Sequence, residues 1–214
     1  MGTREIRQAA AVIAVRDTGR GPEILVIERS KESRFLPGYV SFPGGRTDDL
    51  DAELAGRWFG DAREAARASA VRELLEEVGL ALTADGLRAG AHDELRAIDD
   101  APPPAVRLTQ IARWIAPEDV PVRFDARYFA VEGSGDAEPV PDGIEIARAW
   151  WAPPGELLDL WQAQEVKLYW PTYFTVLALA ECGSAAELIA LDIRTREPDD
   201  RELEYLHRST FWQD

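Results

Sequence analysis

Three glutamates in the segment VRELLEEVGL (71–80) are spaced so that they share one side of a helix. At about 100° per residue, Glu73, Glu76 and Glu77 fall within about 100° of one another. The opposite side of the same helix is apolar and suits a protein core: Val71, Leu74, Leu75 and Val78. Carboxylates at helical spacing repel one another, at a cost of roughly a few tenths of a kcal/mol per exposed pair. We therefore expect a cation on the acidic face.

Oxygen ligands without histidine or cysteine suit a hard cation, Mg²⁺ or Mn²⁺, better than zinc. Arg72 stands four residues before Glu76 and neutralises one of the acids, but one guanidinium does not balance three carboxylates. A protein with a formal net charge of −15 also carries solvated acidic faces, and composition alone favours that plainer interpretation. The surrounding pattern has to decide between the two.

The pattern around the glutamates resembles the Nudix box. RELLEEVGL at 72–80 matches its second half, and FPGG at 42–45 resembles the segment that opens it. Seven residues separate Glu64 from Arg72, the spacing that the box prescribes after its first glutamate. However, 18 residues separate Gly45 from Glu64 where the family usually has five. With ERS at 28–30 and RFDARYFAVE at 123–132, the chain resembles a Nudix branch that carries an insertion here, at about 47–60. Its mammalian representative is a peroxisomal coenzyme A diphosphatase.

The resemblance implies an α/β fold, a Nudix α/β/α sandwich with a mixed β-sheet, and a hydrolase with Mg²⁺ or Mn²⁺ as cofactor. Its substrate would be a nucleoside diphosphate linked to another moiety. Coenzyme A or acyl-coenzyme A is favoured, and ADP-ribose or a dinucleotide stays open. A Nudix-fold module that senses a nucleotide without cutting it is the rival, although such modules usually have a degenerate box and this box has all its acids.

The resemblance also implies roles for individual residues. Glu73, Glu76 and Glu77 would form the metal shell, with the backbone carbonyl of Gly45 close by because a residue without a side chain permits close approach. Arg72 would pair with a box glutamate and fix the loop. The base that takes the proton from water is one of these acids or a later carboxylate, for which Glu145 is the candidate. Glu64 projects about 180° from Glu73 on a regular helix and is interpreted as structural support.

Residues that flank the opening segment are candidates for contact with substrate. Arg29, Arg34 and Arg46 are suited to bidentate contact with phosphate groups, although surface arginines are common. Phe35, Tyr39 and Phe42 are candidates for stacking on a base, although packing in the core is the better interpretation of Phe42. Trp58 and Phe59 lie in the inserted segment, where two aromatic residues in a polar loop indicate a lid, a contact in a homodimer, or a loop that folds back on the protein.

Strands interleaved with helices favour an α/β layered fold. We expect one domain over residues 1–214, with helical elements at its C-terminal end. The expected strands are 8–17, 22–30, a short one within 35–45, 107–117, 126–132, 144–152 and 186–193, and the expected helices are 61–78, 154–164, 171–181 and 199–207. Asp61 is the expected N-cap of the first helix, and Gly79 its left-handed end.

Composition excludes several classes of partner. A net charge of −15 repels a nucleic-acid backbone, because nonspecific affinity comes mostly from lysine and arginine. The longest apolar stretches are far shorter than the roughly 20 residues of a membrane-spanning helix. Cys182 is the single cysteine, so no intrachain disulfide forms, and the sequence after Met1 lacks an export signal. We expect a cytoplasmic protein whose partner is a small nucleotide-containing molecule.

Overall fold

A mixed β-sheet forms the centre of the computed structural model, which describes residues 6–116, 123–133 and 137–193. The strands run in the order β10-β3-β2-β1-β8-β7, and β4 and β9 pair with β1 and β2 respectively. The long strand β1 is parallel to β8 and antiparallel to β2. The bounds are β1 Ile6–Thr18, β2 Gly21–Arg29, β3 Tyr39–Ser41, β4 Gly44–Arg46, β7 Thr109–Ile115, β8 Arg123–Glu132, β9 Ile146–Ala152 and β10 Lys167–Leu168.

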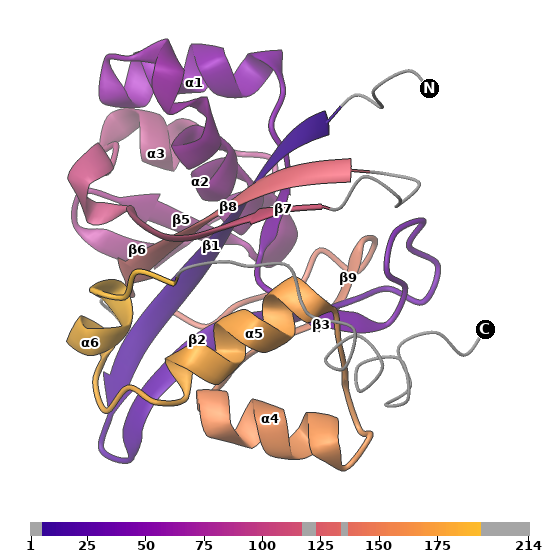
Figure 1. Ribbon diagram of the computed structural model, residues 1–214. Coiled ribbons are helices and arrows are strands. Elements are labelled where there is room, and N and C mark those ends of the chain that lie inside the picture. The colour runs from indigo at the N-terminus through magenta and orange to yellow at the C-terminus, as the bar shows by residue number, and fades with distance from the viewer. Residues whose placement is uncertain (1–5, 117–122, 134–136, 194–214) are drawn as a thin grey trace.

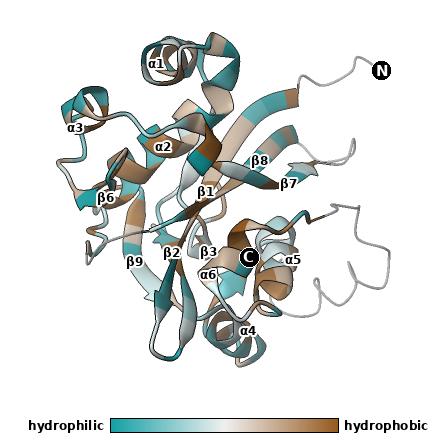
Figure 2. Ribbon diagram, turned by 90° about the vertical axis from the view of Figure 1, so that its left-hand side faces the viewer, coloured by the Kyte–Doolittle hydropathy of each residue, from teal (hydrophilic) through white to brown (hydrophobic). Residues whose placement is uncertain are grey.

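Helices cover both faces of this sheet (Figure 1). One group consists of α1 Asp49–Phe59, α2 Ala65–Val78 and α3 Arg96–Asp100, together with the hairpin of β5 Leu80–Thr83 and β6 Gly86–Ala89. The other consists of α4 Pro154–Gln162, α5 Trp170–Leu179 and α6 Ala185–Ile189. Two short 3₁₀ turns are η1 Ala62–Glu64 and η2 Ala105–Arg107. Figure 2 shows hydrophobic residues on β1 where it passes between the two groups.

Each face of the sheet has its own hydrophobic core, because successive residues of a strand point to opposite faces. Val12 and Leu25 belong to the core under α1 and α2, whereas Ile13 and Ile24 belong to the core under α4 and α5. Burial of both faces explains the near-continuous apolar runs of β1 and β2. The expected α/β/α sandwich with a mixed sheet is confirmed.

Helix α2, expected within 61–78, forms largely as its sequence predicts. The side chain of Asp61 accepts a hydrogen bond from the backbone N–H of Arg63, and the first turn is the 3₁₀ turn η1. Gly79 ends α2 in the left-handed region, at φ 62°, a conformation that glycine adopts at little steric cost. The expected strands 8–17, 22–30, 107–117, 126–132 and 144–152 and the helices near 154–164 and 171–181 are also confirmed, with shifted ends.

Two expectations about local structure are wrong. The segment 186–193 is not a strand: α6 begins after Ser184, whose hydroxyl accepts from the N–H of Glu187, and it buries Ala185 and Leu188. The segment 47–60 is not a polar loop but mainly helix α1. The expected helix 199–207 lies outside the described residues. None of the described helices is long and apolar enough to cross a bilayer.

Helix α1 packs against α2 and is closed at both ends. Asp48 and Asp51 form a reciprocal capping box at its start, and Gly60 ends it at φ 74°. Its inner side buries Leu54 and Trp58, and the indole N–H of Trp58 donates to Asp99 at 2.7 Å. The ring of Trp58 is therefore part of the core. Of the three expected roles, its burial fits a segment that folds back on the protein, and not a lid or a dimer contact.

Candidate active site

A pocket of about 400 Å³ lies where β1, β4 and β8 meet the acidic side of α2 and the first turn of α5. The small residues Ala9, Ala11 and Ala126 leave space on the sheet. Acidic and aromatic side chains also line the pocket. Acids come from α2 and from the loop before β9: Glu73, Glu77 and Glu145. Aromatic rings come from separate segments of the chain: Phe35, Phe42, Trp114, Phe124, Tyr128, Tyr169 and Trp170.

Glu77 is a buried carboxylate, 4% exposed, in the wall of this pocket. One carboxylate oxygen accepts a hydrogen bond from the N–H of Gly44 at 2.8 Å, and the other lies 3.8 Å from Nη1 of Arg29. Burial raises the pKa of Glu77 well above its usual value, and the charge of Glu73 raises it further. Glu77 therefore holds its negative charge at an energetic cost in this environment.

Glu73 lies one turn earlier on α2 and contacts Gly45. A Cβ atom placed on Gly45 would overlap the carboxylate of Glu73, so a larger residue here would displace that carboxylate. Burial raises the pKa of Glu73 to about 7, although Arg72 opposes the shift. Whether the carbonyl of Gly45 binds metal stays a prediction; its missing side chain already has a structural reason.

Arg72 is buried and binds three acids. Its Nε and Nη2 contact the two oxygens of Asp51 at 2.8 and 3.1 Å, Nη2 also contacts Glu73 at 3.0 Å, and Nη1 contacts Glu76 at 2.6 Å. Burial lowers the pKa of Arg72, but the hydrogen bond with Asp51 and the surrounding negative charges raise it above the usual value overall. The predicted pairing of Arg72 with box glutamates is present in the structure.

Glu145 stands at the rim of the pocket. Its side chain is 68% exposed, and its carboxylate lies 4.0 Å from Nη2 of Arg29. The turn that carries it is organised by Asp142, whose carboxylate accepts the N–H groups of Ile144, Glu145 and Ile146. The N–H of Asp142 donates to the carbonyl of Glu77. This turn connects Glu145 to the C-terminal end of α2.

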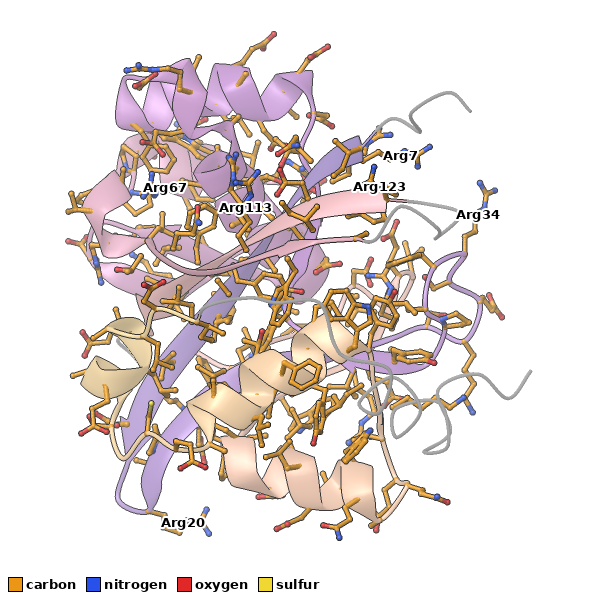
Figure 3. The ribbon with its side chains drawn as sticks, viewed as in Figure 1. Arg7, Arg20, Arg34, Arg67, Arg113 and Arg123 are labelled. Atoms are coloured by element: carbon orange, nitrogen blue, oxygen red, sulfur yellow. The ribbon has the colours of Figure 1, made fainter. Side chains whose placement is uncertain are left out.

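Other predicted site residues lie elsewhere. The side chain of Glu76 is 40% exposed, pairs with Arg72 and does not line the pocket. Arg34 is exposed and points away from the fold (Figure 3). Tyr39 is 8% exposed and belongs to the core beside α4 and α5, so its ring is not placed to stack on a base in the pocket. Arg29 and Arg46 do line the pocket, as expected.

The family of the chain follows from its match to known proteins. A NUDIX domain model matches residues 5–171. The chain belongs to the Nudix family. A relative from Caenorhabditis elegans, named putative nudix hydrolase 7, is 28% identical over 195 residues, which make up 84% of this chain and 62% of the relative. The chain thus spans less than two thirds of that relative.

Solved Nudix structures share the fold. A NUDIX hydrolase from Alicyclobacillus acidocaldarius is 31% identical in sequence and has a TM-score of 0.78. The alignment covers 91% of this chain and 100% of the other. The NUDIX domain of NrtR from Shewanella oneidensis, solved with ADP ribose, is 14% identical, with a TM-score of 0.53 over 86% and 88% of the two chains. That second likeness shows the fold alone.

The position of Asp51 was missed, although the Nudix pattern contains a signal for it. Five residues separate Gly45 from Asp51, the number that the family usually places between the opening glycine and the first acid of the box. Glu64 instead pairs with Arg67, away from the pocket. In the structure Asp51, not Glu64, contacts the arginine of the Nudix box.

The Nudix pocket suits a hard divalent cation by the chemistry of its donors. Glu73 and Glu77 offer carboxylate oxygens from one helix face, and burial raises the pKa of both although Arg72 and Arg29 lie close to them. Mg²⁺ and Mn²⁺ prefer such ligands. Among the described residues, no group of three or more acidic, histidine or cysteine side chains encloses a common point. The structure thus brings two of the three expected glutamates to the pocket, and the metal role of Glu76 stays a prediction.

Proposed function

We propose that this Nudix protein hydrolyses a nucleoside diphosphate linked to another moiety and uses Mg²⁺ or Mn²⁺. The observation that carries the proposal is the pair of buried carboxylates, Glu73 and Glu77, in the wall of a pocket that also holds aromatic side chains. Burying two acids this close is unfavourable without a cation. Binding of divalent ions together with a polyphosphate would offset the free-energy cost of burying these two charged carboxylates.

The residues of the pocket have different proposed roles in the reaction. Glu73 and Glu77 hold the divalent ion, which when bound lowers the pKa of water and screens charge on the phosphoryl group. Arg29, held between Glu77 and Glu145, and Arg46 on β4 orient the diphosphate. A carboxylate takes the proton of the attacking water. Glu73, with a pKa of about 7, and the exposed Glu145 are the two candidates.

The aromatic part of the pocket favours a substrate with a ring to bury. Phe35 and Phe124 meet edge to face at 5.5 Å between centroids, and Trp114 and Trp170 at 5.1 Å. These rings suit a nucleobase, which stacks on aromatic side chains. Together with the sequence resemblance to coenzyme A diphosphatases, this supports coenzyme A or acyl-coenzyme A as the substrate. ADP-ribose and dinucleotides share the same chemistry and are the alternatives.

A nucleotide-sensing role is the second candidate. The observation in its favour is the shared fold with the NrtR domain that was solved with ADP ribose. Such a module would bind ligand in the same pocket without hydrolysing it. The intact Nudix acids of this chain and their burial around the pocket support the enzyme over the sensor.

Incubation with a substrate panel tests the proposal. The purified chain would be mixed with coenzyme A, acetyl-coenzyme A, ADP-ribose, NADH and diadenosine polyphosphates, each with Mg²⁺, with Mn²⁺ and with chelator. Chromatography and ³¹P NMR would follow the products. We expect metal-dependent cleavage of the diphosphate, which releases adenosine 3′,5′-bisphosphate from coenzyme A or its acyl form and a nucleoside monophosphate from the other substrates. Uncut substrates throughout, with binding detected by calorimetry, would replace the enzyme by the sensor.

A further inference from the structure

The side chain of Asp142 organises the turn that carries Glu145. Its Oδ1 atom accepts the N–H groups of Ile144, Glu145 and Ile146 at 3.0, 3.1 and 2.8 Å, and Oδ2 accepts the N–H of Glu145 at 3.2 Å. Gly143 has a φ of 71°, in the left-handed region that glycine adopts at little steric cost. A short aspartate side chain fixes a turn in this way, because it reaches backbone N–H groups just ahead of it. One carboxylate therefore determines the path of the backbone through the whole turn.

Backbone hydrogen bonds attach this turn to two elements of the pocket. The N–H of Asp142 donates to the carbonyl of Glu77 at 3.1 Å. The last carbonyls of a helix have no partner within the helix, so the turn also satisfies an acceptor at the C-terminal end of α2. The carbonyl of Glu145 accepts the N–H of Ser30 at 2.7 Å, directly after β2. The backbone of Glu145 is thus held between α2 and β2.

Arg29 lies between Glu145 and the buried acid Glu77. Its Nη1 atom is 3.8 Å from the carboxylate of Glu77, and its Nη2 atom is 4.0 Å from the carboxylate of Glu145. Because the side chain of Glu145 is 68% exposed, its position depends mainly on the backbone that carries it. A carboxylate that assists a reaction has to stay within hydrogen-bond reach of the reacting group. The fixed turn is what keeps Glu145 at the pocket.

We propose that Asp142 is a positioning residue, which holds Glu145 at the rim of the pocket across Arg29 from Glu77. The proposal rests on the proposed function, since it takes Glu145 as a group that assists the reaction. Asp142 does not line the pocket and acts through the turn. The C-terminal end of α2, the turn and Glu145 form one connected unit, so the helix that carries Glu77 also fixes where Glu145 stands.

Asp142→Ala and Asp142→Asn separate the hydrogen bonds of the turn from the charge of the carboxylate. Alanine removes every acceptor, so the backbone of the turn is free to leave its present conformation. Asparagine keeps an oxygen in the place of Oδ1, which accepts all three N–H groups. We expect kcat of Asp142→Ala to fall roughly tenfold, as far as Glu145→Gln lowers it, with KM within about twofold. The kcat of Asp142→Asn should stay within about twofold of wild type.

A double-mutant cycle tests whether Asp142 acts through Glu145. Residues that act as a unit have non-additive effects, whereas the effects of independent sites add as free energies. The variant with both Asp142→Ala and Glu145→Gln should therefore have the kcat of Glu145→Gln alone. A roughly hundredfold loss in the double variant would overturn the proposal, because the two residues would then act independently. Wild-type kcat in Asp142→Ala would overturn it as well.

Hydrogen exchange measured by NMR tests the turn without any substrate. In Asp142→Ala the N–H groups of Glu145 and Ile146 should exchange faster than in wild type, because they lose their acceptor. The N–H of Gly44, which donates to Glu77, should exchange as slowly as before. Unchanged exchange throughout the turn would contradict the role of Asp142. Gly143→Ala is the second variant if Asp142→Ala does not fold, since it strains the turn at φ 71° and should show the same non-additivity with Glu145→Gln.

Val140→Ala is the matched control in the same segment. The N–H of Val140 donates to the carbonyl of Val78 at 2.9 Å, and its side chain is exposed, so the change keeps the backbone contact with α2. Both kcat and hydrogen exchange should stay at their wild-type values. Equal losses in Val140→Ala would overturn the proposal, because any change in this segment would then act alike. A wild-type chain that cuts no member of the panel would overturn the proposed function and this role with it, whereas failure of the positioning role alone is seen only in the variants.

Discussion

The acids of the pocket are held in two different ways. On the wall formed by α2, Glu77 is 4% exposed and accepts the N–H of Gly44, and Glu73 is held between Gly45 and Arg72. At the rim, the side chain of Glu145 is 68% exposed and lies 4.0 Å from Arg29. The acids of the wall are thus largely buried, whereas the acid at the rim is exposed.

The acids of the wall and the acid of the rim therefore differ in the free-energy cost of carrying a negative charge. Burial disfavours the charged form of an acid in the wall, and a nearby cation favours that form. A bound cation therefore offsets the cost of burying the charge. A rim acid keeps its hydration and costs little stability. We therefore expect changes in the wall to act on metal binding and on folding, and changes at the rim to act on turnover or substrate affinity alone.

Removal of residues 50–59 should have the largest effect, namely loss of the folded state. The deletion takes away the buried residues Leu54 and Trp58 and leaves Arg72 without Asp51. Breaking a buried ion pair by removing one partner costs about 3–5 kcal/mol, against a total stability of about 5–15 kcal/mol. Circular dichroism during thermal unfolding would show no cooperative transition. The exposed change Glu53→Ala in the same helix is the control, and a deletion variant with a native melting curve would return this segment to the status of a loop.

Glu77→Gln and Glu145→Gln compare the wall directly with the rim. Glu77→Gln keeps an acceptor for Gly44 but loses the charge that holds the ion, so kcat should fall roughly 10³-fold. The exposed Glu145 acts through water-screened contacts, and its change should cost roughly tenfold. Steady-state kinetics at saturating Mg²⁺ would measure both. A larger loss for Glu145→Gln would reverse the comparison and make Glu145 the general base.

The sequence predicted the acids Glu73 and Glu77 of the wall for physical reasons. Helical periodicity fixes the side on which Glu73 and Glu77 lie, and local apolar residues fix the other side to the core. Gly79 and Asp61 marked the ends of this region by local backbone chemistry. Such signals need only a few neighbouring residues, and the fold class followed from the same kind of pattern.

Contacts between distant segments were not predictable in this way. Asp51 was missed because its helix was interpreted as a polar loop, although its apolar residues Leu54 and Trp58 are buried by α2 and α3. Phe35 and Phe42 were expected near a base and do line the pocket, but Trp114, Phe124 and Trp170 were missed because they come from segments far apart in the chain. Tyr39 was expected at the ligand, but the short strand β3 turns its ring into the core.

A smaller effect concerns the dependence of stability on pH, measured by urea unfolding without divalent ions. The pKa of Glu73 in the folded protein is about 7, above its usual value of about 4.5, so the unfolded chain loses its proton first. The charged form destabilises the fold, and the penalty grows as pH rises from about 4.5 to about 7. Glu73→Gln carries no such penalty. Its stability relative to wild type should therefore increase over this interval and stay constant above it.

Mg²⁺ is the control for the pH experiment, because an ion bound to Glu73 favours the charged carboxylate. Saturating Mg²⁺ should stabilise the wild type above pH 7 more than it stabilises Glu73→Gln. A stability difference between the two proteins that is the same at pH 5 and pH 8 would show that Glu73 is not strained in the folded state. The wall would then resemble the rim in its electrostatics.

Arg46→Ala and Arg34→Ala should give the smallest effects. They compare an arginine that lines the pocket with one that does not. Arg46 lines the pocket from β4, next to Ala9 of β1, whereas Arg34 points away from the fold (Figure 3). A guanidinium that meets phosphate at an exposed site contributes about 1–2 kcal/mol, so Arg46→Ala should raise KM roughly five- to thirtyfold and leave kcat within about twofold. Arg34→Ala should change KM by less than about twofold. The KM of both variants would be measured at low and high salt, because the contribution of an exposed charge weakens as ionic strength rises. If Arg34→Ala raised KM more than Arg46→Ala, the loop between β2 and β3 would have to close over bound substrate, and the rim would be a moving part instead of a fixed edge.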